Sequence, residues 1–179
     1  MVSIKKIESY KDYGKCLCIT NGVIEAYVTT DIGPRIIRFG YVGEQNILCS
    51  NRAAFGPKDD KQFTDFYGGN KRWENLGGHR IWVSPESYPE TYYPDLEPVD
   101  FDITENGAVF TPKAESENGV AKSLEIKMDA DDANMQVIMR VKNISKKDKD
   151  FAVWGISVSE KGGTLIIPMN TNDTGLLAN

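Results

Sequence analysis

The chain has 179 residues, of which 40% are hydrophobic. A chain of this length is most simply one domain, and folding buries about 70% of the surface that it exposes when unfolded. Its net charge is -5, with acidic and basic residues interspersed. We therefore expect no nucleic-acid binding, since proteins that bind nucleic acids concentrate lysine and arginine on one surface. No apolar run approaches the length of about 18 residues that a membrane-spanning helix needs, so we expect no membrane insertion.

The three cysteines are Cys16, Cys18 and Cys49. An odd number of cysteines, without an apolar N-terminal stretch of the kind that directs secretion, favours a reducing, cytoplasmic location. Cys16 and Cys18 lie two positions apart in an expected strand and therefore point to one face. We interpret them as buried structural thiols rather than as a metal site, and we expect neither a metal nor another cofactor.

The clearest local signal near the N-terminus is a hairpin. Two expected strands, residues 15–20 and 23–30, flank Asn21 and Gly22. The Asn-Gly pair favours a type I′ turn because both residues accept positive φ angles.

A further strand is expected at residues 35–42. In a regular strand, side chains alternate between the two faces of the sheet. Ile37, Phe39 and Tyr41 are therefore predicted to share one face, with Arg38 on the other.

Regular β patterning continues in the second half of the chain. Leu124, Ile126 and Met128 alternate with polar residues and are predicted to lie on one face. No stretch is convincingly helical, and short strands at regular spacing are typical of an antiparallel β-sandwich or barrel. The strands expected here are residues 99–104, 108–112, 123–128, 135–141, 151–159 and 164–168.

Residues 51–98 differ from the strands on either side. They show little periodicity, and we predict a long loop-rich excursion from a single domain that spans residues 1–179. Their second half combines tryptophans, tyrosines, carboxylates, Arg80 and the single histidine, His79. Sugars present hydroxyls around a weakly apolar ring, and their sites pair aromatic rings with planar polar groups. The passage therefore favours a carbohydrate site; the alternative is that its aromatic residues only pack the loop.

His79 is the candidate for proton transfer. It follows Gly77 and Gly78, which would let a ligand approach the backbone closely. A histidine can exchange protons near neutral pH, although a single histidine is also compatible with a structural role. The sequence contains no glycine-rich phosphate loop and no signature of a serine or cysteine nucleophile.

Five short motifs point to the same group of proteins. They are DIGPRI at 31–36, LGGHRIW at 76–82 followed by Pro85 and Glu86, YPD at 93–95 followed by Glu97, GGTLIIP at 162–168 and DTGLL at 173–177. Together they resemble uncharacterised members of the galactose mutarotase-like, or aldose 1-epimerase-like, superfamily. The resemblance implies an all-β, antiparallel β-sandwich, the galactose mutarotase-like supersandwich, with a sugar bound on a concave sheet face. It covers roughly the first two-thirds of the family domain, so we expect the sandwich to be incomplete at its C-terminal end.

The resemblance, together with the aromatic residues of the passage, also implies a set of site residues. His79 and Glu86 are the candidate catalytic residues. The predicted sugar-binding residues are Arg35, His79, Arg80, Trp82, Glu86, Tyr93 and Glu97.

Three functions follow as hypotheses. Mutarotases use a second histidine as acid and a late glutamate as base, and neither has a counterpart in this sequence, so the first hypothesis is a carbohydrate-binding protein. The second is an active aldose 1-epimerase or related sugar isomerase in which His79 and a glutamate transfer protons. The third is a structural or interaction module that pairs an open sheet edge with another chain, for example as a homo-oligomer.

Overall fold

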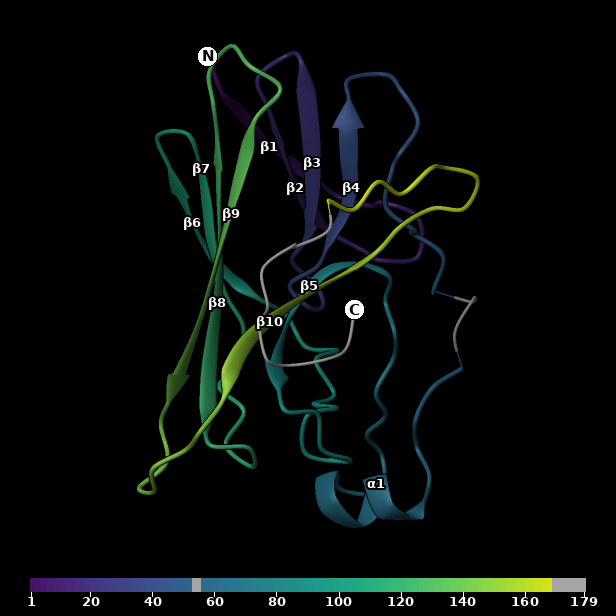
Figure 1. The fold of residues 1–179 in the computed structure, drawn as a ribbon, viewed down its shortest axis with the longest axis vertical. Coiled ribbons are helices and arrows are strands. Elements are labelled where there is room, and N and C mark those ends of the chain that lie inside the picture. Colours follow the sequence, from purple (N-terminus) through teal and green to yellow (C-terminus); the bar gives the residue numbers. More distant parts are fainter. Residues whose placement is uncertain (53–55, 169–179) are drawn as a thin grey trace.

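The computed structural model describes residues 1–52 and 56–168. Within these residues the chain forms a six-stranded and a four-stranded antiparallel sheet, with one short helix (Figure 1). The predicted all-β class and antiparallel pairing are confirmed, and the two facing sheets are consistent with a β-sandwich.

The six-stranded sheet has the order β1-β2-β3-β4-β5-β10. Its last strand comes from late in the chain and pairs with β5 along the full length of both strands. This pairing places residues 152–158 beside residues 78–84, which belong to the passage predicted to hold the site. The strands are β1 (Ser3–Ile7), β2 (Cys16–Thr20), β3 (Ile24–Thr29), β4 (Ile36–Tyr41), β5 (Gly78–Ser84) and β10 (Ala152–Val158).

The four-stranded sheet has the order β6-β7-β8-β9, so each strand pairs with the next one in the sequence. The strands predicted at residues 99–104 and 108–112 are confirmed and form a hairpin: Thr104 pairs with Gly107, which leaves Glu105 and Asn106 as the turn. The strands are β6 (Asp100–Thr104), β7 (Gly107–Thr111), β8 (Val120–Met128) and β9 (Met135–Asn143).

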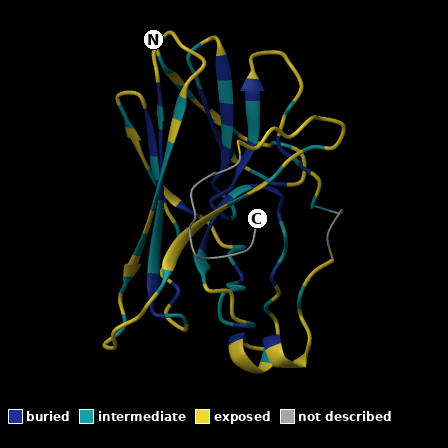
Figure 2. Cartoon of the chain, viewed as in Figure 1, coloured by how far each residue is buried: buried dark blue, intermediate teal, exposed yellow. Residues whose placement is uncertain are grey.

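One hydrophobic core fills the space between the two sheets (Figure 2). It combines residues of both, including Leu17 and Val28 from the six-stranded sheet and Leu124, Ile126 and Met128 from β8. The last three are fully buried, which confirms the face predicted from their alternation. Burial from both sides is what fixes the two sheets against each other.

A β-bulge in β4 changes the predicted face of residues 35–42. The register between β3 and β4 shifts between Tyr27 and Val28, and Ile37 is the extra residue. Ile36 and Phe39 consequently contact the core between the sheets, whereas Ile37 packs in a separate cluster. The prediction of one shared face was wrong because it assumed an uninterrupted strand.

The hairpin between β2 and β3 is confirmed, but its turn is not type I′. Within this loop only Gly22 has a positive φ, +87°. Asn21 instead uses its side chain, whose Oδ1 accepts hydrogen bonds from the backbone N–H groups of Val23 and Ile24, both at 2.9 Å. An asparagine side chain can replace a backbone turn in this way.

Helix α1 (Lys61–Tyr67) and strand β5 both lie within residues 51–98, where no regular element was predicted. The Asp60 side chain caps α1 by accepting a hydrogen bond from the N–H of Phe63 at 3.1 Å. The helix buries Phe63 and Tyr67. In the described part of the chain no helix has the length and apolar character needed to cross a membrane.

Residues 164–168 were predicted as a strand, and this prediction was wrong. They are irregular, and Leu165, Ile166 and Ile167 are exposed. An apolar run favours a strand only where a neighbouring strand can pair with it, and no described segment does so here. The DTGLL motif at 173–177 lies outside the described residues.

Cys16 and Cys18 of β2 are buried free thiols, as predicted. Burial raises the pKa of the Cys16 thiol to about 12. Such a thiol stays protonated and unreactive at neutral pH, which fits a packing role.

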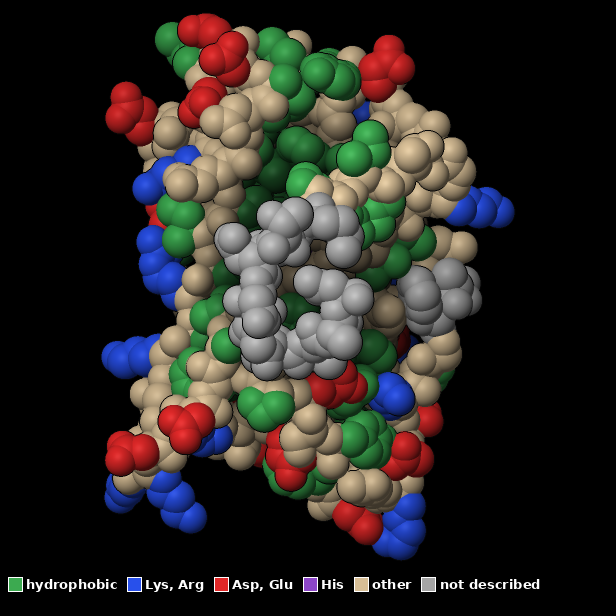
Figure 3. All heavy atoms as spheres, viewed as in Figure 1, with side chains coloured by type: hydrophobic (Ala, Val, Ile, Leu, Met, Phe, Trp, Pro, Cys, Tyr) green, Lys and Arg blue, Asp and Glu red, His purple; other side chains and the backbone are tan. Residues whose placement is uncertain are grey.

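β9 and β10 each lie at the end of a sheet. Val153 and Trp154 on β10 are exposed, and on the face drawn in Figure 3 apolar side chains gather between the sheets while many charged ones lie toward the rim. An exposed edge strand offers unpaired backbone groups to another chain. This is the part of the fold to which the interaction-module hypothesis applies.

Candidate functional site

The turn between β3 and β4 positions Arg35. The Arg35 N–H donates to Thr29 Oγ1 at 2.9 Å, and its carbonyl accepts from the Thr29 N–H at 3.0 Å. Gly33 has a φ of +106°, and a Cβ there would lie 2.7 Å from Thr29 Oγ1. The turn thus requires a glycine and leaves Arg35 only 3% exposed.

Arg35 forms a buried ion pair with Asp95, from the loop that follows β5. Arg35 Nη2 lies 2.6 Å from Asp95 Oδ2, and Nη1 donates to the Pro34 carbonyl at 2.9 Å. The Gly33 N–H also donates to the Asp95 carbonyl at 2.9 Å, which fastens the loop to the turn. Arg35 Nε and Asp95 Oδ1 remain buried without a hydrogen-bond partner in the described structure.

Arg80 on β5 is the second buried arginine, at 6% exposure. Its Cζ lies 3.8 Å from the ring centroid of Trp82 and 4.9 Å from that of Trp73, in cation–π contact with both. Arg80 Nε and Nη1 are buried and unpartnered, and no described carboxylate forms an ion pair with this side chain. Burial, and then the charge of Arg35, lower the pKa of Arg80 to about 10.

The pairing of β4 with β5 brings the two arginines together. Ile36 pairs with His79 in antiparallel register. The next residues outward along that register, Arg35 and Arg80, therefore share the opposite face of the sheet from Ile36 and His79. Two positive charges meet there, and the carboxylates that act on Arg80 are those of Asp95 and Glu86.

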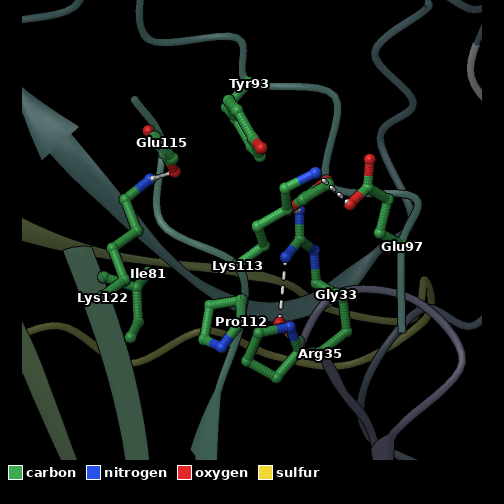
Figure 4. A pocket seen from close by; sticks show the side chains of 11 residues that line it. Gly33, Arg35, Ile81, Tyr93, Glu97, Pro112, Lys113, Glu115 and Lys122 are labelled. Carbon is green, nitrogen blue, oxygen red and sulfur yellow. Dashed lines mark hydrogen bonds and ion pairs between the residues drawn. The ribbon is translucent and has the colours of Figure 1, made fainter. Parts of the chain in front are cut away.

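A small pocket of about 30 Å³ opens beside Arg35 (Figure 4). A smaller hollow of about 10 Å³ around Arg80 shares Arg35, Tyr93 and Asp95 with it. Both volumes are close to that of a single water molecule and lie well below the range of about 300–1,000 Å³ that is usual for small-molecule sites, so a small molecule fits only if the lining moves apart. The walls come from the β3–β4 turn, β5, the loop after β5, and the four-stranded sheet, so the site lies where the two sheets meet.

Two further ion pairs line the larger pocket (Figure 4). Lys113 Nζ lies 3.1 Å from Glu97 Oε2, and Lys122 Nζ lies 2.5 Å from Glu115 Oε1. The Lys122–Glu115 pair is nearly buried, whereas the Lys113–Glu97 pair is exposed. Hydrogen-bonding groups of both signs therefore surround the hollow.

Some aromatic residues of the passage pack its loop onto β5, and others line the hollows. Trp82 Nε1 donates to the Thr91 carbonyl at 2.5 Å, and the Tyr92 ring meets the Trp82 ring edge-on at 5.0 Å. Tyr88 contacts Tyr92 in the same way at 5.2 Å. These contacts fold the loop onto β5, and only Tyr93 among the three tyrosines also lines the larger pocket.

Of the predicted site residues, five line one or both hollows: Arg35, Arg80, Trp82, Tyr93 and Glu97. His79 and Glu86 line neither.

His79 points to the face of β5 opposite Arg80, toward the space between the sheets. Its Nδ1 lies 2.8 Å from Ser157 Oγ on β10, and its Nε2 is buried without a partner. A Cβ on Gly155 would lie 3.2 Å from His79 Cε1, so this glycine makes room for the ring. Burial, and then the charge of Arg35, lower the pKa of His79, so the ring is neutral at pH 7.

Glu86 lies on the loop after β5, where its Oε1 accepts a hydrogen bond from the Tyr92 hydroxyl. Because His79 faces the space between the sheets, the two predicted catalytic residues are not brought to one described pocket.

Gly77 and Gly78 serve the chain's own packing rather than ligand approach. Both have positive φ, +70° and +63°. A Cβ on Gly77 would lie 2.3 Å from the Cys49 carbonyl oxygen, and one on Gly78 would lie 2.2 Å from that of Ile36. The close approach predicted from the glycine pair exists, but it is made by backbone.

Sequence reasoning missed the residues contributed by the four-stranded sheet and its loops, namely Lys113, Glu115 and Lys122. None lies in a motif, and only the packing of one sheet on the other brings them to Arg35. It also missed Trp154, whose ring stacks on Trp82 at 5.9 Å.

No group of three or more histidine, cysteine, aspartate or glutamate residues is placed to hold a metal ion within residues 1–52 and 56–168. Compared with protein-family models, with curated proteins and with solved structures, the chain gives no match. The fold and the pocket define a mostly β protein with a small, arginine-lined hollow. The resemblance to the mutarotase-like superfamily stays a prediction.

Proposed function

We propose that the protein binds a carbohydrate in the pocket beside Arg35, within a sandwich of the galactose mutarotase-like kind. The observation that carries this proposal is the pair of buried arginines, Arg35 and Arg80, whose unpartnered nitrogens stand next to aromatic rings. A buried polar group without a partner costs about 1–3 kcal/mol. A ligand that accepts hydrogen bonds from these nitrogens would remove that cost.

The chemistry of the walls suits a polyhydroxylated ring. Adjacent sugar hydroxyls can accept from the planar guanidinium groups and donate to carboxylates such as Asp95, whose Oδ1 is unpartnered. Tyr93, which lines both hollows, offers a ring face against which the weakly apolar face of a sugar can pack, whereas the faces of Trp82 are taken by Arg80 and the other tryptophans.

Binding without turnover fits the geometry better than epimerase activity. A general acid or base must lie within hydrogen-bond reach of the proton that it transfers. His79 faces away from Arg80, and Glu86 lies outside the lining of both hollows.

Isothermal titration of the folded protein with monosaccharides and oligosaccharides tests the proposal. We expect Tyr93→Ala to weaken binding about tenfold or more, because it removes a lining ring. Tyr41→Ala is the matched control, since Tyr41 is exposed at the end of β4 and lines no described pocket. Absence of binding by any sugar in the panel would refute the proposal.

A further inference from the structure

The charges that line the two hollows do not balance. The lining cations are Arg35, Arg80, Lys113 and Lys122, and the lining carboxylates are Asp95, Glu97 and Glu115. Each carboxylate already has a cation as its ion-pair partner. Arg80 is left as a buried positive charge without an ion-pair partner among the described residues, although Asp95 and Glu86 lie near enough to act on it.

Such a charge is unfavourable in an otherwise folded protein. An arginine at 6% exposure has lost most of its contact with water, and a buried charge is normally paired. The Trp82 and Trp73 rings offset part of this cost, at 3.8 and 4.9 Å from the guanidinium carbon. Nearby Glu86 is bonded by the Tyr92 hydroxyl and forms no ion pair with Arg80.

We infer that the bound carbohydrate carries an anionic group, a carboxylate or a phosphate, which Arg80 holds together with Nε of Arg35. This inference rests on the proposed carbohydrate binding and narrows its ligand class. Stacking on Trp82 covers the face of the Arg80 guanidinium but leaves the N–H groups in its plane, and Nε and Nη1 have no partner. An oxyanion has the several acceptor oxygens that these donors need, in charge-assisted hydrogen bonds.

A neutral sugar would leave the site incomplete. Its hydroxyls can accept hydrogen bonds but cannot neutralise Arg80, so the charge imbalance of the lining would persist. The preference for an anion is therefore a property of the wild-type protein and can be measured without any substitution.

The test compares sugars that differ in one group, by isothermal titration at constant ionic strength. The probes are D-glucose, D-glucuronate and D-glucose 6-phosphate, with the matching galactose series. We expect the anionic members to bind at least about tenfold more tightly than the neutral sugar, as one added charge-assisted contact implies. Tighter binding of the uronates assigns a carboxylate, and tighter binding of the sugar phosphates assigns a phosphate.

Arg80→Met then localises the effect, since methionine keeps a long stem against Trp82 but removes the charge. We expect this variant to lose the preference for the anionic sugar, while circular dichroism checks that it folds. Arg140→Met is the matched control. It removes the same charge from β9, where Arg140 is exposed and pairs with Glu125. It should keep the preference.

Acetate and inorganic phosphate, titrated alone, separate this inference from the proposed function. Equal affinity for neutral and anionic sugars overturns the anion preference and leaves carbohydrate binding intact. Binding of acetate or phosphate without binding of any sugar supports the anion site and overturns the carbohydrate function. Binding of none of the probes overturns both.

Discussion

His79 shows how one half-buried side chain ties stability to pH. Burial lowers its pKa below the ordinary value of about 6.5, which the unfolded chain retains. Below that value the unfolded state binds a proton that the folded state resists. The folded protein is therefore stable above about pH 6.5 and loses stability as the pH falls toward the pKa of the folded state.

We predict that thermal melts between about pH 7.5 and 5.5 show a fall in midpoint that is smaller in His79→Gln than in the wild type. Glutamine can still bond to Ser157 but does not titrate. Glu74, Glu117 and Glu125 have lowered pKa values and so titrate below this interval. The same pH dependence in wild type and variant would show that His79 is not its source.

The buried Arg35–Asp95 ion pair is a second feature of single residues that affects the free energy of unfolding. Removing one partner leaves the other charge buried, and such changes cost about 3–5 kcal/mol. Asp95 is 20% exposed, so we predict the low end of that range, about 3 kcal/mol, for Asp95→Asn in urea unfolding. The double variant Arg35→Met/Asp95→Asn should be more stable than the sum of the two single losses predicts, because it leaves no unpaired charge. Strict additivity would argue against the pair.

Among the elements, β5 depends on Gly78 at its first position. Gly78 combines a φ of +63° with backbone contact to β4, where a Cβ would lie 2.2 Å from the Ile36 oxygen. We predict that Gly78→Ala lowers the free energy of unfolding by more than about 2 kcal/mol, through strain and overpacking together.

Gly69→Ala provides the comparison, since a Cβ there meets nothing within 4 Å and φ lies outside the positive region. We expect a change within about 0.5 kcal/mol for this exposed position. Urea unfolding of both variants measures the difference, and a Gly78→Ala protein as stable as Gly69→Ala would contradict the prediction.

The sequence predicts elements well where the signal is local. Alternation identified β8 and β9, and the Asn-Gly pair identified the first hairpin. β1 went unpredicted because lysines interrupt its pattern, as is common on an edge strand. Helix α1 has only seven residues, too few for a helical period to stand out.

The site residues likewise divide into those that the local sequence indicated and those that only the folded structure brings to the pocket. Arg80, Trp82, Tyr93 and Glu97 lie close together in the sequence, and their composition indicated them. Lys122 and Glu115 reach the pocket only because β8 packs against the other sheet. The local sequence also could not predict which face of β5 carries His79, because pairing with β4 and β10 decides which way this side chain points.

At the scale of the whole molecule, the shared core predicts that both sheets unfold together. All three tryptophans belong to the side of the six-stranded sheet, on β5, β10 and the preceding loop. Phe110 lies on β7 of the other sheet and is fully buried in the core between them. Tryptophan fluorescence therefore reports on one sheet while a substitution at Phe110 perturbs the other.

We predict that Phe110→Ala lowers the free energy of unfolding by about 3–5 kcal/mol, as expected for a deleted core aromatic ring. The fluorescence and circular dichroism transitions should shift together, in one cooperative step. A fluorescence transition that kept the wild-type midpoint would mean that the six-stranded sheet folds independently.

The tryptophan stack has one more consequence. Trp82 lies 5.8 Å from Trp73 and 5.9 Å from Trp154, with ring planes tilted by only 27° and 19°. Indole chromophores this close share their electronic excitation, so their circular dichroism bands should split into an exciton couplet whose sign follows the relative orientation of the rings. Trp154 lies on the edge strand β10. The couplet therefore reports, without any added label, whether β10 keeps its position beside β5.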